Sequence, residues 1–286
     1  MDVLTDSAMW KLNDTEATVY GTVSSTTPLP AGTTIGFVVG DNADINKDNA
    51  TVYTQNAVSY GSFSQHLTGI TGNFGYWYRA YVEAPNGEVF YGTARHFGWE
   101  MVDLGLPSET LWANMNLGAS RPEDDGSYYS WGETTTKPDY SGSNYTVQIS
   151  NTNISGTIYD AAYMTTNYVW RMPTDTQINE LLNGSYCRWT WTTQNDVRGY
   201  LITSLINGHY IFMPAAGIMS GTTITNYTSV GSYWSSVVGD NGYAKTFNFN
   251  SNNHNVRGDG YSNVFGWNDF GNARWPGRSV RAVANQ

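Results

Sequence analysis

The feature that most limits the fold of this chain is a series of short alternating strands before residue 97. β-Branched and aromatic residues alternate with polar ones in residues 18–23 and 33–39, and a Pro-Gly turn signal separates the two runs. Similar runs follow at 51–53, 62–67, 76–83 and 88–92. Pro85-Asn86-Gly87 predicts a tight hairpin between the last two. We therefore expect residues 15–97 to form a β-sandwich, with residues 1–14 as a lead-in segment.

The composition changes at Phe97-Gly98-Trp99, and the chain beyond it is rich in Gly, Ser, Tyr and Trp. One helix is clearly signalled here, because Thr174 can cap it, Asp175 suits its first turn, and Asn183-Gly184 can end it. A weaker helix is expected at 159–165, and strands at 200–203 and 210–217. A few helices against a short mixed sheet predict an α+β domain over residues 99–286.

The last part of the chain contrasts a rigid frame with a polar aromatic segment. Tyr233 to Ser236 form a compact cluster, and residues 278–283 alternate so that Val280 and Ala282 share one face of a strand. The residues between are crowded with Asn, Gly and aromatic side chains. Asn and Gly favour turns, so we expect a surface loop, and its Tyr, Trp, Asn and Ser are residues that binding surfaces prefer.

The candidate ligand-binding residues come from this segment. They are Asn248, Asn250, Asn252, Asn253, His254, Asn255, Asp259, Tyr261, Asn263, Phe265, Trp267, Asn268, Asp269, Phe270, Asn272 and Trp275. The alternative is a long decorated loop whose aromatic rings only cover the core.

Composition excludes several classes of function. The formal net charge is −10 and only 13% of residues are charged, whereas phosphate binding needs a cationic footprint. We therefore expect no nucleic-acid partner, and no membrane insertion because no apolar run reaches the length of a membrane helix. The first residues lack the pattern of a signal peptide, so either a signal has been removed or the protein leaves its cell without one. The single cysteine, Cys187, lies between aromatic neighbours and is expected to be a small buried hydrophobe.

Residues 67–82, LTGITGNFGYWYRAYV, resemble the E–F corner and F strand of fibronectin type III domains. The resemblance implies that the hydroxyl of Tyr76 bonds back to upstream backbone. Alternation then places Tyr76, Tyr78, Ala80 and Val82 inward. It places Trp77, Arg79 and Tyr81 outward, where a cation–π ladder could form on an exposed sheet. We interpret this domain as a fibronectin type III/Ig-like spacer.

Six phrases in the second part occur in one order: VDLGLPSETLWANMNLGA, YSWGET, WRMPTDTQINELL, IFMPAAG, YWSS and GRSVRAV. Together they resemble the Fibrobacter-type major paralogous domain family, which has the C-type-lectin fold in its formylglycine-generating-enzyme-like variant. The resemblance implies a compact frame that displays loops near its C-terminus. Some proteins with this fold are the variable proteins of diversity-generating retroelements, including phage tail receptor-binding proteins.

Enzyme and metal chemistry are weakly signalled. The formylglycine-generating enzymes use two cysteines, and this chain has one. The four histidines have no ligand-like spacing, and Glu123-Asp124-Asp125 is expected to be a solvated acidic turn. Trp267-Asn268-Asp269 matches the calcium tripeptide of sugar-binding lectins without the partner motif, and Arg257-Gly258-Asp259 matches the integrin tripeptide. We expect no metal and no cofactor.

These observations predict a non-enzymatic ligand-binding protein, with a structural surface or fimbrial component as the alternative. The expected partner is a protein or glycan receptor on another cell surface, and the expected location is extracellular, on a cell surface or a virion. Adenine-directed mutagenesis acts on Asn codons. The mixture of Asn with Asp, Tyr, Ser, Val and Phe between 248 and 275 is therefore the pattern that such diversification produces.

Overall fold

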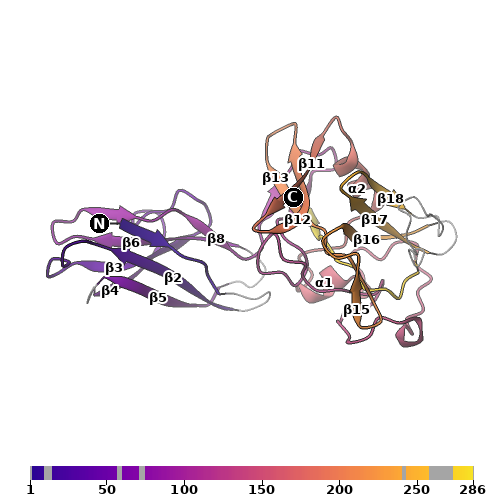
Figure 1. Ribbon diagram of the computed structural model, residues 1–286, viewed down its shortest axis with the longest axis horizontal. Coiled ribbons are helices and arrows are strands. Elements are labelled where there is room, and N and C mark those ends of the chain that lie inside the picture. The colour runs from indigo at the N-terminus through magenta and orange to yellow at the C-terminus, as the bar shows by residue number, and fades with distance from the viewer. Residues whose placement is uncertain are drawn as a thin grey trace. The chain divides into compact units, whose positions relative to one another are not determined.

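The chain folds into two compact units, Met1–Trp99 and Glu100–Gln286 (Figure 1). The computed structural model describes residues 2–9, 15–56, 60–70, 75–239, 243–257 and 273–285, and for 255–257 it describes only the backbone. Strands account for about 45% of the residues and helices for about 6%, so the protein is predominantly β. Among the described residues, no helix is long and apolar enough to cross a membrane.

The first unit consists of two antiparallel sheets. Its strands are β1 (Asp2–Thr5), β2 (Glu16–Ser24), β3 (Thr34–Gly40), β4 (Thr51–Asn56), β5 (Gly61–Thr68), β6 (Tyr76–Glu83), β7 (Val89–Tyr91) and β8 (Arg95–Phe97). One sheet has the order β1-β2-β5, and the other has the order β4-β3-β6-β7 with β8 also paired to β6. The alternating runs in the sequence predicted β2 to β7 because β-branched residues on one face of each strand face a core.

Apolar side chains from both sheets pack against one another and form the core of this unit. Val23 of β2 contacts Ile35 of β3 and Val82 of β6 in one buried cluster. The hairpin between β6 and β7 closes at Gly87, which has a φ of +86° that suits glycine, as the Asn-Gly signal predicted.

The expectation of a lead-in segment is wrong for residues 2–5, because they form β1, and all four of them pair with the end of β2. The strand is fixed by side chains from β6 and β8: the Tyr78 hydroxyl donates to the Asp6 carbonyl, and Arg95 Nε donates to the Thr5 carbonyl at 2.5 Å. Four residues are too short a run to show a period, so the sequence pattern alone did not predict this strand.

The alternation on β6 is only partly as predicted. Tyr78, Ala80 and Val82 are buried, but Tyr81 is fully buried too, in a second cluster with Val38 and Ile45. The loop that carries Ile45 covers this face, so the sheet is not exposed there. Arg79 lies over the ring of Tyr91, 4.7 Å from its centroid, rather than between Trp77 and Tyr81.

The second unit combines small sheets with short helices. Its elements are β9 (Met101–Asp103), β10 (Thr110–Ala113), a 3-10 turn (Gly142–Asn144), α1 (Ala161–Thr165), α2 (Asp175–Leu182), β11 (Cys187–Gln194), β12 (Val197–Ser204), β13 (Tyr210–Pro214), β14 (Ile218–Ser220), β15 (Thr223–Thr225), β16 (Val230–Val238), β17 (Ala244–Asn250), β18 (His254–Arg257) and β19 (Val283–Asn285). The strand orders are β19-β10-β9, β11-β12-β13, β14-β15 and β16-β17-β18. The last strand of the unit, β19, therefore pairs with β10, the second strand of the unit.

Helix α2 forms where the sequence predicted it. Thr174 and Gln177 make a reciprocal capping box at its start, and Ile178 and Leu181 are buried on its inner face. The core of the unit is built on this face together with Leu104, Trp112, Ile202, Tyr233 and Phe249. Cys187 is buried in the same cluster, as expected, and burial raises the pKa of its thiol to about 11. The weaker helix at 159–165 is also present, as the five-residue α1.

Candidate functional site

The frame of the candidate site is the hairpin of β16 and β17. The expected rigid cluster at its centre is confirmed, because Tyr233, Trp234, Ser235 and Ser236 are all buried. The Tyr233 hydroxyl donates to the Pro214 carbonyl at 2.7 Å, and Trp234 Nε1 donates to the Tyr129 carbonyl at 2.6 Å. Each ring therefore joins β16 to a separate segment of the chain, so the hairpin has one fixed position in the unit.

The C-terminal stretch 278–283 closes this frame. Val280 and Ala282 are buried as expected, but the predicted alternation is wrong because Arg278, Ser279 and Arg281 are buried as well. Isolated bridges join Arg278 to Tyr129 and Ser279 to Tyr233, and regular pairing begins only at β19. A segment that is covered on all sides shows no period in its burial.

Two arginines in this stretch are buried against neutral acceptors. Arg281 donates from Nε to Asn116 Oδ1 at 2.9 Å, and from its terminal nitrogens to the carbonyls of Ala113 at 3.1 Å and Phe212 at 2.7 Å. Burial lowers the pKa of Arg281 to about 10. Arg278 donates to the Ser232 hydroxyl and lies 4.9 Å from the centroid of the Trp234 ring.

Asn248 belongs to the frame and not to an exposed surface. The segment 244–257, expected to be a surface loop, forms β17 and β18, and Asn248 is 3% exposed. Its Oδ1 accepts from Ser232 Oγ at 2.5 Å, and its Nδ2 donates to Thr246 Oγ1 at 2.9 Å. Because Ser232 also accepts from Arg278, the buried amide completes a polar network that a count of Asn residues in sequence does not reveal.

The exposed part of the described site is the turn between β17 and β18. Asn250 Oδ1 accepts from the backbone N–H of Asn252 at 2.9 Å and of Asn253 at 3.0 Å, and the Asn250 N–H donates to the Asn253 carbonyl at 2.8 Å. Asn250 therefore shapes the turn, while Asn252 and Asn253 are exposed, and Asn252 Oδ1 accepts from Ser251 Oγ at 3.5 Å. Asn255 lies in β18, and its side chain is outside the described residues.

His254 brings β18 onto an aromatic cluster that sequence reasoning missed. Its imidazole stacks on the indole of Trp189 in β11, with centroids 4.5 Å apart and planes 7° apart. Tyr200 and Phe249 meet Trp189 edge-on, at 5.2 and 6.3 Å, and Trp191 meets both of them in the same way. Trp189 and Trp191 are only partly buried. Their spacing of two in a β-branched run was the signal that could have identified them.

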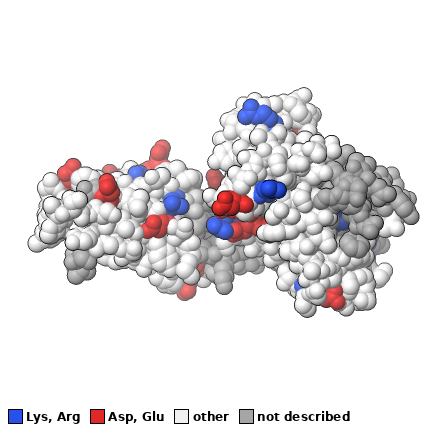
Figure 2. Space-filling model, in the orientation of Figure 1, with Lys and Arg blue, Asp and Glu red and all other residues white. Residues whose placement is uncertain are grey.

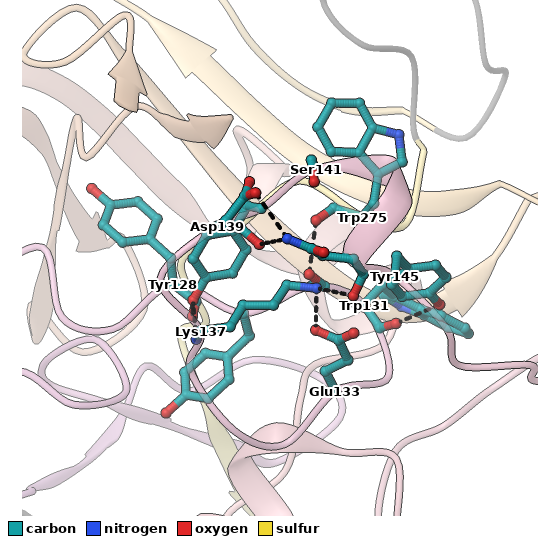
Figure 3. A network of polar contacts seen from close by, with 12 residues as sticks. Tyr128, Trp131, Glu133, Lys137, Asp139, Ser141, Tyr145 and Trp275 are labelled. Atoms are coloured by element: carbon teal, nitrogen blue, oxygen red, sulfur yellow. Dashed lines mark hydrogen bonds and ion pairs between the residues drawn. The ribbon is translucent and has the colours of Figure 1, made fainter. Parts of the chain in front are cut away.

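Trp275 stands at the other described end of the candidate segment, beside the network drawn in Figure 3. Ser130 Oγ donates to the Trp275 carbonyl at 2.7 Å. The indole of Trp275 lies against Gly142, since a Cβ added to this glycine would be 3.6 Å from the ring. Arg274 lies over Trp131, 4.6 Å from the ring centroid, and donates to the Ile149 carbonyl at 3.1 Å. The backbone at residues 274–275, which leads into the 278–283 stretch, is therefore fixed by contacts with residues of the 130–149 region.

Lys137 is the centre of that network. Its Nζ contacts Glu133 Oε2 at 2.7 Å and the Asn144 carbonyl at 3.2 Å, and it lies 5.5 and 5.7 Å from the ring centroids of Tyr140 and Tyr145 (Figure 3). The Tyr145 hydroxyl donates to the Trp131 carbonyl at 2.9 Å, and burial raises the pKa of this tyrosine. An ion pair this enclosed is a structural tie that fixes the 133–145 segment around Trp131.

The chain matches no family model and no curated protein. The site is therefore assessed from its own geometry. Candidate residues Asp259, Tyr261, Asn263, Phe265, Trp267, Asn268, Asp269, Phe270 and Asn272 lie outside the described residues, as does the aspartate of Arg257-Gly258-Asp259.

The acidic cluster expected as a solvated turn is partly buried. Glu123 is 2% exposed and accepts from Asn195 Nδ2 at 2.8 Å and Gln194 Nε2 at 3.3 Å, so the expectation is wrong at this residue. Asp124 pairs with Arg121 at 2.7 Å, and burial raises the pKa of Asp125. Across the described ranges, no group of three or more His, Cys, Asp and Glu side chains could hold a metal ion.

The described surface on the face of the protein drawn in Figure 2 is mostly uncharged. In Figure 2 the charged side chains are single or in small groups, and most of the visible surface is white. The described part of the site follows this pattern, because it combines amides with an aromatic cluster. Such a surface can stack on rings and exchange hydrogen bonds through amide groups.

Proposed function

We propose that the second unit is a non-enzymatic recognition domain with the C-type-lectin fold in its formylglycine-generating-enzyme-like variant. Its ligand is a protein or glycan receptor on another cell surface, and its binding surface extends from the β17–β18 turn to Trp275. The surface is of the diversified type made by diversity-generating retroelements. The first unit is a fibronectin type III-like spacer, and the protein acts outside the cell, on a cell surface or a virion.

The observation that carries this proposal is the contrast between the frame and the turn. Tyr233, Trp234, Arg278 and Arg281 are buried and bonded to distant strands, whereas Asn252 and Asn253 are exposed on a turn that Asn250 holds in shape. Binding sites are commonly polar and aromatic loops on a rigid scaffold, since a preformed scaffold reduces the ordering cost of binding.

Two further features support the proposal. The motifs GRSVRAV and YWSS supply the buried arginines and the Tyr233-Trp234 pair, so the residues that carry the family resemblance are those that build the frame. In the first unit, two packed antiparallel sheets are compatible with a fibronectin-like sandwich. The hydroxyl of Tyr78 also ties β6 to the chain that follows β1, but the Asp6 carbonyl that it reaches lies 72 residues upstream, so this bond is not the local tie of a tyrosine corner.

The proposal is tested by measuring binding of the full chain to glycan arrays and to intact cells. Triple replacement of Tyr261, Phe265 and Phe270 by Ala should weaken binding by about 1–3 kcal/mol for each residue that is an aromatic anchor. The matched control is Tyr210→Ala, because Tyr210 is 60% exposed in the same unit and lies outside the proposed surface.

The proposal predicts that the control binds like wild type and that both variants keep the wild-type melting temperature. Binding that survives the triple replacement but is lost in a variant of the first unit, such as Trp77→Ala, would place the site on the other domain.

A further inference from the structure

The stack of His254 on Trp189 is the contact by which β18 lies on β11. Trp189 is a fixed platform for it, since its Nε1 donates to the Leu181 carbonyl at 2.9 Å and Phe247 meets the ring edge at 5.4 Å. Tyr200 also meets the imidazole edge-on, at 5.5 Å. One face of His254 is therefore covered by a partner that is itself held in place.

The imidazole of His254 has one nitrogen that no described residue satisfies. Its Nδ1 is buried and has no hydrogen-bond partner within the described part of the chain. In the neutral ring the proton can sit on Nε2, which leaves Nδ1 as a bare lone pair. Protonation would place an N–H donor, with positive charge, where the described part of the chain offers no acceptor. Burial accordingly lowers the pKa of His254.

The charged groups on the neighbouring elements do not compensate for this. Helix α2 packs beside β18 (Figure 1), but its Asp175 pairs with Lys245 at 2.6 Å and its Glu180 accepts from Ser108 Oγ at 2.6 Å. Arg188, beside Trp189 on β11, points to the exposed face of that strand. The described residues thus contain no ion pair to His254, and a cation–π contact with Trp189 supplies no acceptor for Nδ1.

We propose that His254 is an acid-sensitive latch that holds β18 against β11 while its imidazole is neutral and releases it when the ring is protonated. The consequence for binding rests on the proposed function, because β18 leads directly into the segment assigned to the ligand. The latch itself needs no ligand to be observed.

The test is amide hydrogen exchange of the full chain without ligand, near neutral pH and at about pH 5. The matched variant is His254→Phe, which keeps a ring on Trp189 but cannot titrate. Comparing the two proteins at one pH removes the intrinsic effect of pH on exchange. His209→Gln is the control, because His209 is the other histidine of this unit, and its Nδ1 is hydrogen-bonded to the Asp103 carbonyl at 2.7 Å.

In acid, the β17–β18 amides of wild type and His209→Gln should exchange faster than those of His254→Phe. The ratio of the exchange rates, wild type over His254→Phe, should grow by up to about tenfold per pH unit below about 6.5, the ordinary pKa of histidine. Equal exchange in all three proteins at both pH values overturns the latch.

A measurement on wild type alone guards against a variant that does not fold. The His254 ring resonances should titrate together with the loss of β18 protection, and titration with β18 still protected overturns the proposal. If the latch opens but no receptor is bound at any pH, the proposed function fails while the latch stands.

Discussion

Replacing Arg281 by Lys should destabilise the second unit strongly, because its guanidinium is buried at 1% exposure and makes three hydrogen bonds to neutral acceptors. The acceptors belong to two separate parts of the unit: Ala113 and Asn116 lie at and just after the end of β10, and Phe212 lies in β13. A lysine ammonium is a compact point charge and cannot reproduce the planar fork that reaches all three. We expect it to keep one bond and lose two.

The magnitude follows from these bonds. A hydrogen bond to a charged group contributes about 1.5–3 kcal/mol, so two lost bonds amount to about 3–6 kcal/mol before relaxation. We expect a net loss of about 3 kcal/mol after relaxation, which for a unit of this size lowers the melting temperature by about 6–12 °C. Arg188→Lys is the control, because Arg188 is exposed on β11 and surface changes usually stay within about 0.5 kcal/mol.

The assay is urea unfolding of the full chain followed by tryptophan fluorescence and by far-ultraviolet circular dichroism. The loss should appear only in the transition of the second unit, without a change in the denaturant slope. A value for Arg281→Lys within about 1 kcal/mol of wild type would show that the three bonds do not hold the frame.

Three further predictions concern pH and metal. Burial lowers the pKa of His96 to about 4. As pH falls from about 6.5, the unfolded state therefore binds a proton that the folded state does not bind, and the first unit loses stability. His96→Phe should make the stability of this unit less dependent on pH, and an unchanged slope in acid denaturation curves would contradict the prediction. Burial raises the pKa of Tyr78 to about 12, so its contribution is complete below about pH 10 and is lost as pH rises towards 12; a spectrophotometric titration in which Tyr78→Phe changes nothing above pH 10 would count against this. Dialysis against a chelator should leave the melting temperature and receptor binding unchanged, and a large loss that calcium restores would return the sugar-lectin interpretation of Trp267-Asn268-Asp269.

The regular elements that could be predicted from the sequence, among them β2 to β7 and α2, are those whose signals are local. Alternation predicted β6 with its observed bounds, and the Thr174 cap with the apolar positions of Ile178 and Leu181 predicted α2. The burial of Tyr233 and Trp234 followed from their aromatic character. These features depend on residues within a few positions of each other, which a single sequence displays.

The features that were missed depend on distant contacts. Alternation predicted that Tyr81 is exposed, but the loop with Ile45, from elsewhere in the chain, covers it. Glu123 is buried because Asn195 and Gln194 reach it from the end of a hairpin. Asn248 was expected on the surface, because its sequence neighbours do not show that Ser232 and Arg278 form a buried polar network with it. The stack of His254 on Trp189 joins two edge strands whose adjacency no local pattern predicts.

The central claim is that a rigid frame displays a surface that tolerates change. The most direct measurement is a saturation-mutagenesis library of the displayed full chain, sorted for protease resistance and then for binding to unrelated targets. The account predicts that Asn252, Asn253 and residues 259–272 accept most substitutions and yield binders, while Trp234, Val280 and Arg281 accept few. A library in which Asn252, Asn253 and residues 259–272 are as intolerant as the frame, or from which no binder emerges, would contradict it.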